Sequence, residues 1–280
     1  MISPTDPLMD IVAFYDTHPI NEQQILHTLA RQGIALDTLT EDLLMAHDQD
    51  HFGGVEANDI LAAQAGITRH HVVLDVCSGM GGPARYIAHR LGCRVVGLDF
   101  TVSRHHSAQR LTHLVGLDHL VRFEHGNALA MPFGDASFDV VMGQEAWCHV
   151  PDKARLIAEC VRVVKPGGTI AFTDILRRAT LSEAEFTRLQ RGLLFPTLET
   201  QDGYRALLEG HGYSVVACDD LSEDWARILV QRLAMYRGLK DDTIREFGAE
   251  RFRAWDEIYA FFVGLYSAGE LAGARFVARR

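Results

Sequence analysis

The 280-residue sequence has no long apolar run, few cysteines and no histidine motif typical of a metal site. No stretch approaches the roughly 18 apolar residues of a membrane span, and the opening MISPTDPLMD lacks the basic and apolar regions of a secretory signal. The five cysteines include no CxxC pair, so we expect reduced thiols in the cytoplasm rather than a disulfide framework. The 14 histidines include no HExxH motif, and we expect no metal site.

Positive charge is also scarce. The chain has 27 Lys and Arg residues against 37 Asp and Glu residues, a formal net charge of −10. An acidic surface repels phosphate backbones, so nucleic acid is excluded as a partner. With 48% hydrophobic residues, the composition is that of an ordinary globular protein without a membrane partner.

Short apolar runs alternate with helical patterns through the middle of the chain. Such alternation predicts βα units and a mostly parallel sheet. The predicted strands are 72–76, 94–98, 121–128, 138–144, 169–175 and 213–218, with helices at 83–91, 101–115 and 152–164 and a turn at KPGG, 165–168.

Two regions fall outside this rhythm, namely residues 1–70 and 222–270, which contain helical patterns rich in aromatic residues. We expect them to form a helical lid over the carboxyl ends of the strands, where ligands of open α/β sheets bind; the alternative is that they cover a sheet edge. The α/β core then occupies 71–221, and 271–280 returns as its last strand.

The stretch DVCSGMGG, 75–82, links the first strand to a helix. A glycine-rich turn at a helix N-terminus directs backbone N–H groups toward an anion, and Gly79, Gly81 and Gly82 permit positive φ. Cys77 suits such a turn only if its own φ is negative. By itself, the pattern fits a dinucleotide phosphate site, an S-adenosylmethionine site or a plain tight turn.

The later motifs separate these cases. Asp99 ends the second strand about twenty residues on, where an acid can accept hydrogen bonds from a ribose diol. It is followed by GNALAMPF (126–133), FDVVMGQ (138–144) and RVVKPGGTIAFTD (162–174). In this order, the motifs resemble the class I S-adenosylmethionine-dependent methyltransferases over roughly 72–218. The resemblance implies a Rossmann-like, doubly wound, seven-stranded sheet.

The resemblance also implies site roles. Asp75 would order the turn and the cofactor's amino group, Asp99 would bind the ribose, and Asn127 would accept a hydrogen bond from the adenine amine. Two positions depart from the usual pattern, because Cys77 replaces glycine and Asn127 replaces aspartate. The implied cofactor-binding residues are Asp75, Cys77, Ser78, Gly79, Gly81, Asp99, Phe100, Asn127, Ala128, Leu129 and Gln144.

Longer segments narrow the resemblance. GGPARYIAHRLGCRVVGLD (81–99) is similar to a small-molecule group that includes glycine, sarcosine and dimethylglycine N-methyltransferases, and 195–225 is similar to the sarcosine/dimethylglycine type. The implied activity is N-methylation of an amine or amino acid in a lid-covered pocket, with a homodimer left open.

Candidate acceptor residues follow the fourth strand. Trp147 would meet developing positive charge with its aromatic face, or else fill the core. His149 would accept a proton, or else fix the loop. Glu145 would bind the acceptor or cap the next helix, and Tyr15 would shape the far side or pack in the lid.

Three other functions compete with N-methylation. An O- or C-methyltransferase for a natural product would use His149 as general base. A protein could bind S-adenosylmethionine without transferring its methyl group. A nicotinamide-dependent oxidoreductase would use the same turn, but GNALAMPF and KPGG have no role there.

Overall fold

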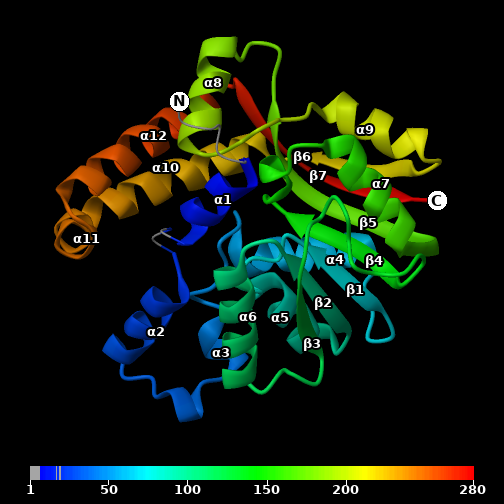
Figure 1. Cartoon of the computed structure of the whole chain (residues 1–280), viewed down its shortest axis with the longest axis horizontal. Helices are drawn as coiled ribbons and strands as arrows, with labels where there is room; N and C mark the ends of the chain where they lie inside the picture. The colour runs from blue at the N-terminus through cyan, green and yellow to red at the C-terminus, as the bar shows by residue number, and fades with distance from the viewer. Residues whose placement is uncertain (1–6, 17, 19) are drawn as a thin grey trace.

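A seven-stranded sheet is the centre of the computed structural model, which describes residues 7–16, 18 and 20–280 (Figure 1). The strand order is β3-β2-β1-β4-β5-β7-β6, and only β7 is antiparallel to its neighbours. The strands are β1 Val72–Val76, β2 Arg94–Asp99, β3 Val121–His125, β4 Phe138–Gln144, β5 Val164–Arg177, β6 Ser214–Asp220 and β7 Leu271–Arg279. The predicted doubly wound, mostly parallel fold is confirmed.

Helices cover both faces of the sheet. The central strands β1 and β4 are almost continuously apolar and buried, as expected for parallel strands covered on both sides. Leu61, Ile87 and Ala108 pack against one face, and Leu156 and Tyr204 against the other. The helices are α4 Gly54–Ala65, α5 Gly82–Leu91 and α6 Val102–Leu114 on the first face, and α7 Lys153–Val163 and α9 Gln201–Gly210 on the second.

The KPGG segment is not the predicted turn but part of β5. Phe138 pairs with Val164, whereas Val140 pairs with Thr169, so residues 165–168 bulge out of the ladder. Gly167 supplies the positive φ of 76° that this bulge requires. The strand therefore starts earlier than its apolar run.

Three helices connect β6 to β7: α10 Ser222–Gly238, α11 Lys240–Phe247 and α12 Ala249–Ser267. Figure 1 shows α10 and α12 side by side, with α11 at their far end. The apolar residues of α10 and α12 form a separate core with α8, Glu183–Gly192. In the part of the chain that is described, no helix combines the length and apolarity needed to cross a membrane.

The N-terminal helices complete this layer: α1 Pro7–Asp16, α2 Glu22–Arg31, a 3₁₀ turn η1 Leu36–Thr38 and α3 Glu41–Leu44. Helix α1 bridges two parts of the molecule. The Tyr15 ring lies 5.0 Å from the guanidinium carbon of Arg104 in α6, and the Phe14 ring lies 5.8 Å from that of Trp255 in α12. We call α1 and α10–α12 together the lid.

Close packing of Trp225 on Gly273 joins the lid to the sheet. A Cβ at Gly273 in β7 would overlap the Trp225 ring, which is 3% exposed. The Gly273→Ala variant should therefore lose about 1–3 kcal/mol of unfolding free energy, the usual effect of overpacking, measured by urea denaturation.

Gly264 in α12 is the matched control, since a Cβ there meets no atom within 4 Å. Gly264→Ala should leave stability unchanged or raise it by up to about 1 kcal/mol. Equal urea midpoints for Gly273→Ala and the parent protein would contradict the packing argument.

Candidate active site

A cavity of about 1020 Å³ lies between the lid and the carboxyl ends of β1, β2 and β4. Single-ligand pockets usually measure about 300–1,000 Å³, so this one has room for a cofactor and a second molecule. Most residues predicted from the sequence line it: Tyr15, Asp75, Cys77, Ser78, Gly79, Asp99, Phe100, Asn127, Ala128, Gln144, Glu145 and His149. Gly81, Leu129 and Trp147 are not among its lining residues.

The glycine-rich turn differs from prediction in two ways. Cys77 has a positive φ of 64°, so the expectation of a negative φ is wrong. The expectation of free N–H groups is also wrong for part of the turn. The amides of Cys77 and Ser78 donate to the Leu98 carbonyl at 2.8 and 3.0 Å, and the Gly79 amide donates to Asp99 Oδ2 at 2.8 Å. These bonds tie the turn to the end of β2.

Three buried polar atoms around this turn make no hydrogen bond within the described residues: Asp75 Oδ2, Ser78 Oγ and Gln144 Oε1. The carboxylate and amide oxygens can only accept. Burial, with a further contribution from Asp99, raises the pKa of Asp75 to about 7. An ammonium group would satisfy these acceptors, so the residues fit the amino-acid end of S-adenosylmethionine.

Asp99 is oriented by main-chain donors. Its Oδ1 accepts from the Thr101 amide and its Oδ2 from the Gly79 amide, both at 2.8 Å. Burial raises the pKa of Asp99, although these bonds oppose the shift. Each oxygen keeps a lone pair, which suits a ribose diol.

Asn127 lines the cavity next to Ala128, but its Oδ1 already accepts from the Leu129 amide at 2.8 Å. The side chain therefore retains one lone pair and its Nδ2 donors for an adenine edge. Leu129 acts through its backbone, behind Asn127.

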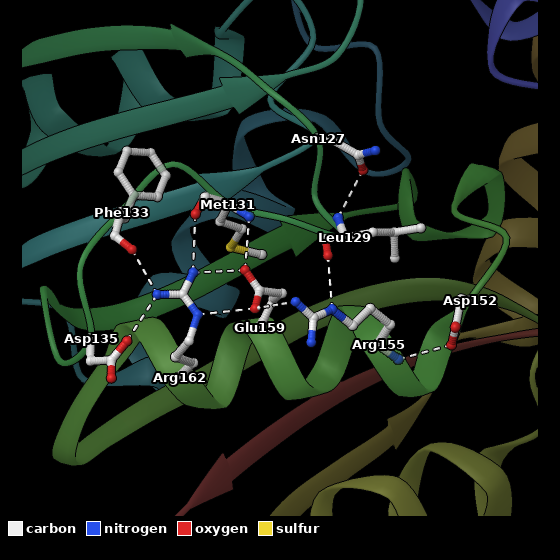
Figure 2. Close-up of polar contacts among 9 residues, drawn as sticks. All are labelled: Asn127, Leu129, Met131, Phe133, Asp135, Asp152, Arg155, Glu159 and Arg162. Carbon is white, nitrogen blue, oxygen red and sulfur yellow. Dashed lines mark hydrogen bonds and ion pairs between the residues drawn. The ribbon is translucent and has the colours of Figure 1, made fainter.

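Arg162 in α7 holds the loop that carries Asn127 (Figure 2). Its guanidinium donates to the carbonyls of Met131 and Phe133 at 3.0 and 2.7 Å, and pairs with Asp135 at 3.0 Å and Glu159 at 2.7 Å. One side chain thus fixes three points of the loop.

Glu159, 3% exposed, completes this clamp from the same helix (Figure 2). It accepts from the Met131 amide at 2.8 Å and pairs with Arg155 at 3.1 Å, while Arg155 Nε donates to the Leu129 carbonyl at 2.9 Å. Hydrogen bonding from Arg162 lowers the pKa of Glu159, so the clamp stays ionised.

Arg85 in α5 joins the glycine-rich turn to the N-terminal segment. Its fully buried guanidinium donates to the Met80 carbonyl at 2.7 Å, to Thr112 Oγ1 at 3.2 Å and to Asp48 Oδ2 at 2.8 Å. Glu41 lies 3.6 Å from its Nε, and burial raises the pKa of Glu41 to about 8.

Two polar links join the N-terminal segment to the end of β4. Glu145, with φ 47°, accepts hydrogen bonds from the Phe52 amide and from Thr173 Oγ1, and burial raises its pKa to about 7. Gln144 Nε2 donates to Asn58 Oδ1 at 2.6 Å. Glu145 thus holds the cavity wall in place.

His149 lines the cavity from the 3₁₀ turn η2, Trp147–His149. Its Nδ1 lies 3.0 Å from the Leu194 carbonyl, which can only accept, so the proton is assigned to Nδ1 and Nε2 keeps a lone pair. Burial lowers the pKa of His149 to about 4. Its ring lies 5.5 Å from that of Tyr15, whose pKa burial raises well above the ordinary value. Both side chains are therefore neutral near pH 7.

The prediction that Trp147 meets the acceptor is wrong. The indole is fully buried, lies 4.2 Å from the Phe172 ring and donates to the Val76 carbonyl at 3.3 Å. Gly143 leaves the space that it fills, since a Cβ there would overlap the indole. The 3₁₀ turn directs Trp147 into the core and His149 into the cavity.

Sequence reasoning missed several lining residues. Trp255 and Tyr259, one helical turn apart on α12, line the cavity rather than a closed core, and Phe195 and Asp50 join them from loops. The four-residue spacing of the two aromatics was a detectable signal. In the described ranges, no three His, Cys, Asp or Glu residues are grouped to hold a metal ion.

Comparison with known proteins agrees with this geometry. The family described as "Methyltransferase domain" matches residues 74–172. The glycine/sarcosine/dimethylglycine N-methyltransferase of Actinopolyspora halophila is 29% identical over 69% of this chain, and the sterol 24-C-methyltransferase of Eremothecium gossypii is 37% identical over 61%. The matches span only 34% and 44% of those two proteins.

A solved structure supports the fold. Phosphoethanolamine N-methyltransferase 2 of Haemonchus contortus, in complex with phosphomonomethylethanolamine and S-adenosylhomocysteine, superposes with a TM-score of 0.74 at 20% identity. The match covers 90% of this chain and 59% of that one.

The raised pKa of Asp75 predicts a pH-dependent affinity. An ammonium group favours the ionised carboxylate, so binding releases a proton and affinity rises as pH passes upward through about 7. S-adenosylhomocysteine should bind more tightly at pH 8 than at pH 6, by up to about tenfold per unit below the pKa. In Asp75→Asn this dependence should vanish, and in the exposed control Asp118→Asn it should persist. Calorimetry tests this, and a pH-independent affinity in the parent protein would refute the assignment.

The positive φ of Cys77 predicts opposite effects of two substitutions. Cys77→Gly adopts this backbone without strain and should keep cofactor binding and stability within about 1 kcal/mol. Cys77→Val should lose about 1–3 kcal/mol, because a β-branched side chain is strained there. Urea denaturation and calorimetry check both, and equal stability of the two variants would contradict the turn geometry.

Proposed function

Since residues 74–172 belong to the class I S-adenosylmethionine-dependent methyltransferases, we propose that this protein methylates the nitrogen of a small-molecule amine held in the lid-covered cavity. The family and the cofactor predicted from the motifs are confirmed. The acceptor and the site roles are our proposal. The domain boundaries, the cytoplasmic location and the homodimer stay predictions.

This proposal rests on the low pKa of His149, which makes its imidazole a weak base. Bound S-adenosylmethionine supplies a methyl group on a sulfonium, which moves to the nucleophile as the C–S bond breaks and its electron pair passes to sulfur. An uncharged amine attacks through its own lone pair and needs no base in that step. A phenol or carbon acid does need one, and His149, with a pKa of about 4, is a weak base.

The chain's contribution is positioning and exclusion of water. His149 Nε2 offers a lone pair to an amine N–H, which orients the nitrogen. Tyr15 covers the same end of the cavity from α1, and its ring lies beneath Arg104. The positive charge passes from sulfur to nitrogen, and a proton on the product nitrogen leaves to solvent after release.

O- or C-methylation remains the second candidate, favoured by the many apolar side chains of the cavity. The weak basicity of His149 opposes the version of this reaction in which that residue is the general base. Binding of the cofactor without any transfer is the third outcome to be tested.

Transfer of a labelled methyl group tests the proposal. The purified chain should place the label on the nitrogen of N-methyltyramine and not on its phenol oxygen, as fragment masses show, and His149→Ala should lower its kcat by less than about tenfold, since general-base catalysis contributes about 10²–10⁴. The exposed His119→Ala is the control. Label on 4-ethylphenol but on no amine would overturn N-methylation, and a hundredfold loss in His149→Ala would restore the general base.

A further inference from the structure

Six aromatic side chains that line the cavity form a closed circuit of neighbouring rings. Each ring centroid lies 5.1–6.3 Å from the next, within the range of favourable ring contacts, and every member lines the cavity. In order, this aromatic belt consists of Phe14, Trp255, Tyr259, Phe262, Phe195 and His149.

The belt is assembled from distant parts of the chain. Helix α1 contributes Phe14 and α12 contributes three members, while Phe195 and His149 come from the segments that follow α8 and β4. Aromatic rings that line a cavity attract cations, because each π surface is negative. Both sulfonium and ammonium groups are cations of this kind.

Asp50 adds a negative charge to the same space. Its side chain lines the cavity, and its carboxylate makes no hydrogen bond or ion pair with any residue that the structure describes. Burial lowers the pKa of His18 and of His149, and the charge of Asp50 opposes both shifts. Asp50 thus lines the same cavity as the belt, and its charge acts on His149, a member of the belt.

The neighbouring arginines are already engaged. Arg232 donates to the carbonyls of Asp50 and His51 at 3.1 and 2.6 Å, and Arg104, 4% exposed, lies over the Tyr15 ring. The other lining arginines, Arg31 and Arg245, come from the last turns of α2 and α11. Asp50 is thus a lining acid without an ion pair to any described residue, whereas Arg232 is engaged by main-chain carbonyls and Arg104 by an aromatic ring.

We propose that the acceptor is an amine with an apolar body and no carboxylate, whose ammonium form is bound by Asp50 and the aromatic belt and whose nitrogen attacks after its proton has passed to solvent. This inference rests on the proposed function. The same groups stabilise the charge that appears on nitrogen as the N–CH₃ bond forms and the S–CH₃ bond breaks. A zwitterionic amino acid would bring its own carboxylate next to Asp50.

Three matched probes test this without any turnover. N,N,N-trimethyltyramine is a cation that cannot be methylated further, 4-(3,3-dimethylbutyl)phenol is its uncharged isostere, and N,N,N-trimethyltyrosine adds a carboxylate. Calorimetry on the full chain with S-adenosylhomocysteine should show the cation binding at least tenfold more tightly than the isostere and fivefold more tightly than the trimethyltyrosine. Failure of the cation to exceed the isostere, including no binding of either, overturns the cation site.

Substitutions test which side chains form the cation site. Asp50→Asn should weaken the trimethyltyramine complex at least tenfold and leave the affinity for the isostere and for S-adenosylhomocysteine unchanged. Asp37→Asn, an exposed acid of η1, should change none of these. Trp255→Leu should weaken the cation more than the isostere, because it removes a π face but keeps an apolar surface. Equal losses for cation and isostere in Asp50→Asn would overturn the role of that charge.

The outcomes separate this inference from the proposed function. Tight binding of trimethyltyramine without label transfer to any amine would leave the cation site standing and refute N-methylation. Labelling of N-methyltyramine together with equal binding of trimethyltyrosine would keep N-methylation and refute the exclusion of a carboxylate.

Discussion

The buried guanidinium of Arg85 is the interaction on which the site most depends. It binds the carbonyl inside the glycine-rich turn, a hydroxyl on α6 and the carboxylate of Asp48 at once. A buried charge without its partners costs several kcal/mol, so these three pieces are held together. The segment that follows Asp48 then carries Asp50, His51 and Phe52 into the cavity wall. The glycine-rich turn and this part of the cavity wall are therefore held as one rigid unit.

Because water is excluded from the cavity, burial shifts the pKa values of its acids and its histidines in the same sense, toward the uncharged form. Burial raises the pKa of Asp75 and of Glu145 to about 7 and lowers that of His51 and His149 to about 4. Each group is pushed toward its uncharged form, as a low dielectric requires. A cation entering this space loses water but gains contact with aromatic rings and carboxylates.

The sequence predicted those residues of the cavity lining that follow strand ends. Asp75, Asp99 and Asn127 follow strand ends, and strand ends are visible as short apolar runs. The left-handed φ of Cys77 was not visible, because backbone conformation inside a turn is set by bonds to Leu98 and Asp99. Likewise, the burial of Trp147 depends on the space above Gly143, and the place of Trp255 depends on its contact with α1, and no local pattern encodes either.

The clamp on the loop that carries Asn127 has a consequence for how this loop can change. Arg155, Glu159 and Arg162 reach carbonyls and an amide of residues 129–133, not their side chains (Figure 2). The course of the loop backbone therefore does not depend on which side chains these residues carry. Side chains there can be exchanged while the backbone stays in place, so substitutions in this loop can change its contacts without changing its course.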